Sequence, residues 1–185
     1  MTLRRETGPF VTPLPRRRTR LGLAVLASFL SMPFAASAQP GTADPRLVAR
    51  GQYLVTIMDC GGCHTPGALA GRPDSSRRLA GSDIGFAIPD VGVVYPKNLT
   101  PDAETGLDTW TDAEIVRAIR QGQSRDGRPL IPVMPWPSYV ILDDADAQAI
   151  VAYLRSLSPV RFQVPLNVKA GEKPTAPYLT VVTPQ

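Results

Sequence analysis

The chain has 185 residues, of which 43% are hydrophobic, with two cysteines, one histidine and a formal net charge of +4. This length predicts one domain, and two cysteines cannot supply a disulfide framework. Six of the 20 basic residues and one of the 16 acidic residues lie before residue 39, so the rest of the chain carries a net charge of −1. That charge excludes the basic surface that nucleic-acid binding requires, and we expect no nucleic-acid partner.

Residues 1–38 have the three parts of a secretory signal peptide. A basic stretch ends at Arg20, an apolar run covers residues 21–35, and Ala36-Ser37-Ala38 supplies the small residues of a cleavage site. We expect cleavage after Ala38 and export of the remainder. The alternative is an uncleaved membrane anchor, but the run is shorter than the roughly 20 residues that span a bilayer, and Pro33 interrupts it. We therefore expect membrane association only through such a leader or through a partner.

The first helix of the exported part is predicted from residue 44 to Cys60. Asp44 is suited to capping the free N–H groups of a helix, and Pro45 is suited to its first position. Apolar residues then recur at helical spacing, and Gly61-Gly62 is expected to end the helix. The members of this apolar stripe are Leu47, Val48, Gly51, Leu54, Val55 and Met58.

Residues 65–110 are rich in Gly, Pro and Asp and have no long periodic pattern. Residues 84–88 alternate weakly and predict at most a short strand. A compact domain seldom contains so long an irregular segment unless the segment is functional. We therefore expect this segment to wrap around a bound group.

Two further helices follow, and then a tail. Residues 111–114 match a capping box, which predicts a helix that ends near Gly122. The carboxylates of Asp143 and Asp144 predict the start of a third helix, which Pro159 closes. Residues 159–185 contain five prolines and no periodicity, so we expect this tail to be extended over the surface or mobile.

The chemistry is carried by the motif Cys60-Gly61-Gly62-Cys63-His64, the spacing that attaches c-type haem. The two thiols can add to the haem vinyl groups, and His64 is then held beneath the iron as an axial ligand. The glycines are expected to let the backbone pass close to the porphyrin edge. Three alternatives are a reactive dithiol, a small disulfide loop between the cysteines, and a zinc site, which would need further ligands.

Met134 is the candidate for the second axial iron ligand. His64 is the only histidine, and of the four methionines Met1 and Met32 lie in the leader. Met58 precedes Cys60 on the first helix, on the wrong side for the opposite haem face. The prolines around Met134 keep its loop out of a helix. The alternatives are a methionine that fills the core, and water, an amide or an open position at the iron.

Several polar side chains have two interpretations. Trp110, Trp136, Tyr95 and Tyr139 are expected to be core aromatics with a polar handle, and the alternative is hydrogen bonding to the haem propionates. Arg128 is expected to be solvated at the surface, with pairing to a propionate as its alternative.

The chain resembles class I c-type cytochromes, in particular the single-haem modules in cytochrome subunits of bacterial periplasmic dehydrogenases. The resemblance covers about residues 45–158. It rests on an ordered set of stretches at residues 60–65, 94–102, 105–107, 110–112, 115–120, 126–128, 134–136 and 149–154. Those dehydrogenase subunits often carry several haem modules, whereas this chain has one haem motif.

The resemblance implies an all-α fold with helices around one covalently attached haem c. The domain boundaries that follow are a signal peptide at residues 1–38, a cytochrome c domain at 39–158 and a proline-rich tail at 159–185. The first and last helices would cross near Gly51 and Tyr153 or Leu154, and His64 and Met134 would be the axial ligands of the iron.

The resemblance and the ligand set together predict a periplasmic one-electron carrier rather than an enzyme. The expected partners are redox proteins, with a dehydrogenase as donor and an oxidase or another cytochrome as acceptor. One alternative is a fixed cytochrome subunit that accepts electrons within a membrane-associated dehydrogenase complex. Another is an enzyme or gas sensor with an open iron position.

Overall fold

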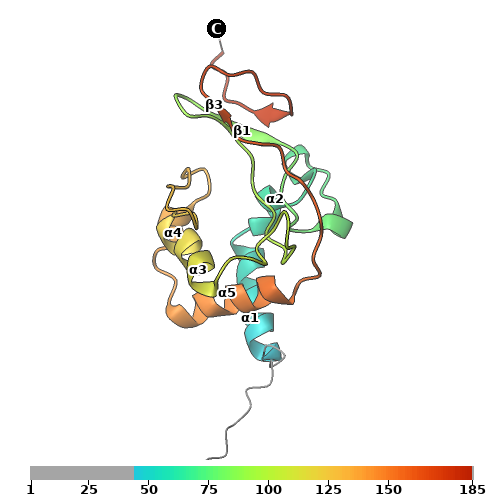
Figure 1. Cartoon of the computed structure of the whole chain (residues 1–185), viewed down its shortest axis with the longest axis vertical. Coiled ribbons are helices and arrows are strands. Elements are labelled where there is room, and N and C mark those ends of the chain that lie inside the picture. The colour runs from blue at the N-terminus through green and yellow to red at the C-terminus, as the bar shows by residue number, and fades with distance from the viewer. Residues whose placement is uncertain (1–43, 185) are drawn as a thin grey trace, which may run out of the picture. The chain divides into compact units, whose positions relative to one another are not determined.

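The computed structural model describes residues 44–184, so the predicted signal peptide and its cleavage site lie outside the described residues. This part contains five α-helices, two short 3-10 helices and four short strands (Figure 1). No helix in the described range is long and apolar enough to cross a membrane. The helices are α1 (Pro45–Ile57), α2 (Cys60–His64), α3 (Asp112–Gln121), α4 (Trp136–Tyr139) and α5 (Asp144–Ser156). The remaining elements are η1 (Ala68–Ala70), η2 (Ser75–Arg77), β1 (Gly85–Ile88), β2 (Gly92–Val94), β3 (Val168–Lys169) and β4 (Tyr178–Leu179).

Helix α1 begins as predicted, with the Asp44 side chain accepting a hydrogen bond from the backbone N–H of Arg46 and Pro45 in the first turn. Its predicted end is wrong. The helix stops at Ile57, because Asp59 adopts a left-handed conformation with φ of 52°. Asp tolerates this conformation better than most residues. Gly61 and Gly62 then lie inside the separate helix α2.

Helices α1 and α5 cross at Gly51, as the resemblance implied. A Cβ atom at this position would lie 1.9 Å from the backbone oxygen of Ala149 and 2.7 Å from the Cβ of Tyr153. Only glycine therefore allows the two backbones to approach this closely. Arg50 adds a two-pronged ion pair to Asp146 of α5, with both N–O distances at 2.8 Å. The core at this crossing includes Leu54, Val55, Ile150, Val151 and Leu154.

Helix α3 starts with the predicted capping box. The Thr111 hydroxyl accepts from the N–H of Glu114, and the Glu114 carboxylate accepts from the N–H of Thr111. The helix ends at Gln121 and is capped by Gly122, which has a φ of 61°. A Cβ on Gly122 would lie 2.3 Å from the indole of Trp136. Gly122 therefore lets the segment that carries Met134 pack against the end of α3.

The irregular segment before α3 is held by a buried polar cluster of Asn98, Thr100 and Thr105. The Asn98 amide donates to the Thr105 hydroxyl at 2.9 Å and to the backbone oxygen of Val160 at 2.8 Å. The backbone N–H and the hydroxyl of Thr100 both donate to the Asn98 side-chain oxygen. Asn98 and Thr100 are each 1% exposed. The start of the tail is thereby fixed to the segment that was expected to wrap a bound group.

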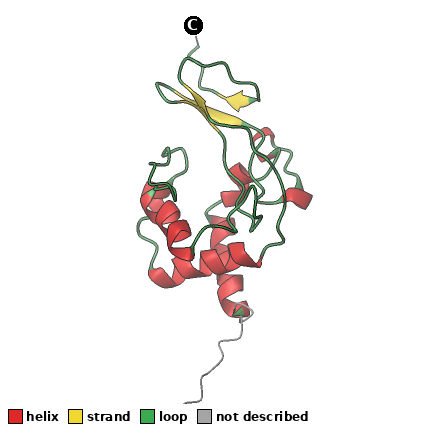
Figure 2. Ribbon diagram, viewed as in Figure 1, coloured by secondary structure: helices red, strands yellow, loops and turns green. Residues whose placement is uncertain are grey.

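The tail also contributes to a small sheet with the strand order β3-β2-β1-β4 (Figure 2). The weak alternation at residues 84–88 is confirmed as a strand, β1, which pairs antiparallel with β2 and parallel with β4. Regular secondary structure in the described residues is therefore mainly helical, as expected, with a small sheet that the all-α prediction did not include. The tail has no regular secondary structure from residue 159 to residue 167 and then contributes the two outer strands.

Candidate haem site

A cavity of about 500 Å³ lies between the helices and the irregular segment, within the size range of small-molecule and cofactor sites. Its walls are mainly apolar. They include Val55 of α1, Leu99 and Leu107 of the irregular segment, Ile119 of α3, Leu130 of the following loop and Ile150 of α5. The segment that was expected to wrap a bound group therefore forms one wall of this cavity.

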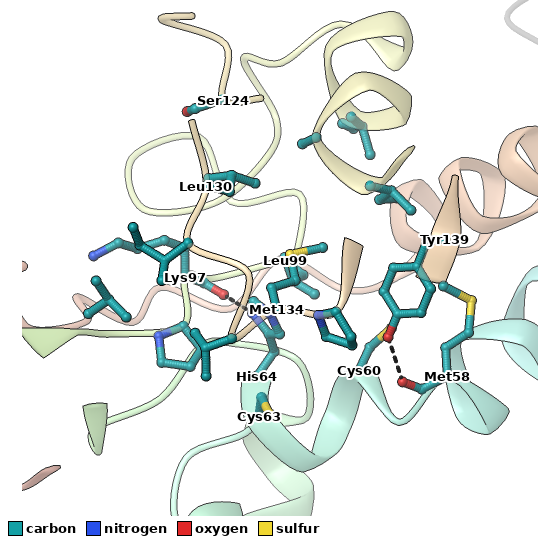
Figure 3. Close-up of a pocket in the computed structure, with 18 of the residues that line it drawn as sticks. Met58, Cys60, Cys63, His64, Lys97, Leu99, Ser124, Leu130, Met134 and Tyr139 are labelled. Atoms are coloured by element: carbon teal, nitrogen blue, oxygen red, sulfur yellow. Dashed lines mark hydrogen bonds between the residues drawn. The ribbon is translucent and has the colours of Figure 1, made fainter. Parts of the chain in front are cut away.

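One end of the cavity is formed by α2, which brings Cys60, Cys63 and His64 to the same wall (Figure 3). Asp59 turns the chain between α1 and α2, and its carboxylate folds back over Gly62. A Cβ on Gly62 would lie 2.3 Å from an Asp59 carboxylate oxygen, whereas one on Gly61 would meet nothing closer than 3.6 Å. Gly62 therefore also makes room for the Asp59 carboxylate, and the expected approach of the two glycines to a porphyrin edge stays a prediction.

His64 is oriented by a hydrogen bond between its Nδ1 atom and the backbone oxygen of Lys97, at 2.7 Å (Figure 3). A carbonyl oxygen can only accept, so Nδ1 must carry the proton and Nε2 keeps a free lone pair. Removal from water lowers the pKa of His64 below its usual 6.5, although the Lys97 carbonyl opposes this shift. The neutral imidazole is thus held in the form that coordinates a metal through Nε2.

Both cysteines are free thiols. Burial raises the pKa of Cys60 to about 11, with a further contribution from the Asp59 carboxylate, and burial also raises the pKa of Cys63. A reactive dithiol needs the opposite shift, because its thiolate is the nucleophile. In the described part of the chain, no group of three or more His, Cys, Asp or Glu residues could hold a metal ion. The raised pKa values of the two thiols therefore disfavour a reactive dithiol. The described residues do not assemble a zinc site.

Met134 lines the same cavity as His64, from a segment 70 residues further along the chain (Figure 3). The backbone around it is fixed by a hydrogen bond from the N–H of Trp136 to the Met134 oxygen, at 2.7 Å. The indole N–H of Trp136 donates to the backbone oxygen of Leu130 at 3.3 Å, and its ring packs on Gly122. Met134 is therefore presented on a segment that is tethered at two points.

Met58 also lines the cavity, which sequence reasoning missed. In Figure 3, Tyr139 lies between Met58 and His64. The Tyr139 hydroxyl donates to the backbone oxygen of Met58 at 3.1 Å. The cavity lining thus contains two methionines, Met58 and Met134.

Tyr95, Trp136 and Tyr139 donate to backbone oxygens, as expected for core aromatics with a polar handle. Tyr95 is 3% exposed and its hydroxyl donates to the backbone oxygen of Ala176 in the tail, at 3.1 Å. Sequence reasoning did not find that the tail reaches the cavity, where Asn167 forms part of the lining beside Lys97. No periodic or motif signal marks Asn167, because the tail follows the surface of the domain rather than forming a helix.

The sequence model of the family Cytochrome c matches residues 48–158. The chain belongs to the cytochrome c family, whose members bind covalent haem c and transfer electrons without being catalytic themselves. Within that family it is a class I c-type module like those in cytochrome subunits of bacterial dehydrogenases. The helical fold and the cavity described above agree with this assignment.

Three curated relatives illustrate the similarity. The chain is 40% identical over 127 residues to a nicotinate dehydrogenase subunit of Pseudomonas putida, which covers 69% of this chain and 10% of that protein. It is 34% identical over 142 residues to the cytochrome c subunit of a quinone alcohol dehydrogenase of Gluconobacter oxydans. This match covers 76% of this chain and 28% of that protein. It is 37% identical over 139 residues to the gluconate 2-dehydrogenase cytochrome c subunit of Pantoea cypripedii. This match covers 75% of this chain and 29% of that protein. The chain thus spans less than a third of the length of each.

The residues of the cavity fit haem c. Two free thiols three positions apart, a neutral imidazole with an available Nε2 and a thioether all line one apolar space of suitable size. These are the side-chain types that attach and ligate haem in c-type cytochromes. The donor set therefore agrees with the cofactor that the family binds.

Proposed function

We propose that this chain is a periplasmic one-electron carrier in which Cys60 and Cys63 attach haem c and His64 and Met134 ligate its iron. Haem c, when bound, supplies reversible one-electron chemistry at its iron. The observation that carries the proposal is the convergence of these four side chains on one apolar cavity. Export by cleavage after Ala38, which leaves Gln39 as the new N-terminus, is part of the proposal.

The protein's own residues perform three tasks. Lys97 holds the His64 proton on Nδ1 through its backbone oxygen, which keeps Nε2 available for the iron. Met134 supplies a soft thioether, which favours the ferrous state and raises the reduction potential. The apolar walls exclude water. A ligand pair that stays in place in both oxidation states leaves little rearrangement to accompany electron transfer.

The ligand assignment is tested by the optical spectra of the exported protein and of two methionine variants. We expect a low-spin c-type spectrum for the wild type. Met134→Leu should lose the weak sulfur-to-iron charge-transfer band, whereas Met58→Leu, which changes the other methionine of the cavity, should keep it. Loss of the band in Met58→Leu with retention in Met134→Leu would remove Met134 from the proposed site.

The attachment is tested by acid extraction of the denatured protein. Haem held through two thioether bonds should remain with the wild-type polypeptide, and the double variant Cys60→Ser, Cys63→Ser should retain none. Release of the haem from denatured wild-type protein would contradict the proposal. N-terminal sequencing of the exported chain should begin at Gln39.

The similarity to subunits favours a second candidate, in which the chain is a fixed electron acceptor within a membrane-associated dehydrogenase complex. Relatives that share 34 to 40% identity carry the names of dehydrogenase subunits. Purification from the native host distinguishes the two candidates. A carrier would elute alone, whereas a fixed subunit would elute together with a catalytic chain in constant proportion.

A further inference from the structure

Lys97 contacts the C-terminal segment through its side chain while its backbone oxygen holds His64. The ammonium donates to the side-chain oxygen of Asn167 at 3.0 Å and to the backbone oxygen of Pro165 at 3.3 Å. Asn167 also accepts from the backbone N–H of Tyr95 at 3.1 Å, so its amide is itself fixed. Asn167 lies beyond residue 158, where the match to the family ends.

The hydrogen-bonding capacity of Lys97 is not exhausted by these contacts. An ammonium has three N–H donors, and two of them are bound by the C-terminal segment. The third has no acceptor in the part of the chain that the structure describes, although Lys97 lines the cavity. Arg128 lines the cavity as well, and burial together with the charge of Arg128 lowers the pKa of Lys97. Arg128 forms an exposed ion pair with Asp126 at 3.6 Å, whereas the Lys97 ammonium has no acidic partner among the described residues.

The charges around the cavity are distributed unevenly. Asp59 is the one acidic residue of the cavity lining within the described range, and its charge acts on Cys60, Cys63 and Tyr139. In Figure 3, Cys60 and Tyr139 lie on the opposite side of His64 from Lys97. The Lys97 ammonium is therefore on the side of His64 away from Cys60, and the carboxylates of haem are at the porphyrin edge opposite the vinyl groups that the thiols would bond.

We infer that Asn167 is a positioning residue that holds the Lys97 ammonium at the rim of the cavity, where Lys97 and Arg128 receive the two carboxylate groups of haem c. The inference rests on the proposed function, because the carboxylates belong to the proposed cofactor. It places a haem-directed residue in the C-terminal segment, outside the part of the chain that matches the family.

The reduction potential of the haem-loaded protein provides the test. A nearby positive charge stabilises the less positive ferrous iron, so Lys97→Met should lower the potential. At a fixed ambient potential the ratio of oxidised to reduced protein should rise roughly threefold or more. Lys169→Met removes the same charge from an exposed position two residues beyond Asn167, and it should leave this ratio nearly unchanged. Equal ratios for the two lysine variants would overturn the inference.

A double-mutant cycle tests whether Asn167 acts through Lys97. Asn167→Leu should shift the potential in the same direction as Lys97→Met but by less, because the ammonium is released rather than removed. In the Lys97→Met background, Asn167→Leu should have no further effect. Additive shifts would show that Asn167 does not position the ammonium and would overturn the assignment.

Asn167→Asp covers the case in which Asn167→Leu does not fold, because it keeps an acceptor for the N–H of Tyr95. Its carboxylate should take the ammonium from the haem carboxylates and lower the potential. An unchanged potential would overturn the inference. Acid extraction of the denatured wild-type protein distinguishes a failure of this inference from a failure of the proposed function. Loss of haem in that extraction would contradict the covalent attachment, whereas an unchanged potential in a protein that keeps its haem would contradict only the role of Asn167.

Discussion

The hydroxyl of Tyr139 donates a hydrogen bond of 3.1 Å to the backbone oxygen of Met58, and this bond joins segments 81 residues apart. The first segment leads into Cys60, and the second begins just after Met134. Burial raises the pKa of Tyr139 to about 12, with smaller contributions from the nearby cysteines and Asp59. The hydroxyl therefore keeps its proton, and remains a donor, throughout the neutral and mildly alkaline range.

Tyr139→Phe should loosen the Met134 segment while leaving its packing intact. Loss of a neutral hydrogen bond to a partly buried oxygen should lower the free energy of unfolding by about 1 kcal/mol. Urea denaturation followed by circular dichroism measures this change, and the charge-transfer band of the haem-loaded protein should be lost at a lower urea concentration. Tyr53→Phe, at an exposed position on α1, is the control. Equal behaviour of the two variants would contradict the role of the Tyr139 bond.

Gly51→Ala should be strongly destabilising although alanine favours helices. The new methyl group would lie 1.9 Å from the backbone oxygen of Ala149, so α1 and α5 would have to separate. Overpacking of this kind costs about 1–3 kcal/mol and exceeds the helix-propensity gain of about 1 kcal/mol when the backbone must move. Chemical denaturation of Gln52→Ala, one position away on the exposed side of α1, should show no loss. A Gly51→Ala protein as stable as the wild type would contradict the close crossing.

The ion pair between Arg50 and Asp146 predicts a specific loss of stability in acid. Hydrogen bonding to Arg50 lowers the pKa of Asp146 below its ordinary value of 3.8. Because the pKa of Asp146 is lower in the folded protein than in the unfolded chain, its ion pair stabilises the fold at pH values above 3.8. This stabilisation is lost as the pH falls toward the pKa of Asp146 in the folded protein. Between pH 5 and pH 3, the free energy of unfolding should fall less steeply in Asp146→Asn than in the wild type.

Asp144→Asn is the matched control for this pH dependence. Asp144 is in the first turn of the same helix and pairs with Arg120, but its side chain is 92% exposed. An ion pair this exposed contributes little to stability, so Asp144→Asn should lower the free energy of unfolding at pH 5 by less than Asp146→Asn does. Parallel slopes for the wild type and Asp146→Asn would contradict the assigned role of the ion pair between α1 and α5.

The C-terminal segment should be required for stability although the family match ends before it. A chain that ends at residue 158 loses the Val160 oxygen that accepts from Asn98, and Val164, which packs against Gly81. Each buried polar group left without a partner costs about 1–3 kcal/mol. We expect this truncation to lower the free energy of unfolding by more than about 2 kcal/mol. A chain that ends at residue 180 keeps these contacts and the bond from Tyr95 to Ala176, so it should be affected much less. Equal losses would contradict this account.

The three main helices were predictable because their signals are local. The Asp44-Pro45 start, the capping box at Thr111 and the acidic start at Asp143 each act within one turn. The haem motif is equally local, since its spacing alone indicates the chemistry. These features could be found by reading a few residues at a time.

The remaining features depend on contacts between distant parts of the chain. The bond between His64 and the Lys97 carbonyl spans 33 residues, and the one between Lys97 and Asn167 spans 70. Strands β3 and β4 have two residues each, and they form because β1 and β2 offer edges for pairing. Segments of two residues are too short for any sequence pattern to predict a strand. The end of α1 was missed because it depends on one left-handed residue, Asp59, rather than on the glycines beside it.

The burial of Asn98 has a practical consequence for recombinant production. Residues 98–100 read Asn-Leu-Thr, the acceptor pattern for N-linked sugars in eukaryotic secretory compartments. An attached sugar would replace one of the two amide hydrogens that Asn98 donates to Thr105 and Val160, and it would need space that a 1% exposed side chain does not have. Glycosylation before folding would therefore trap the chain in a misfolded form, so a bacterial host is the appropriate source of the protein.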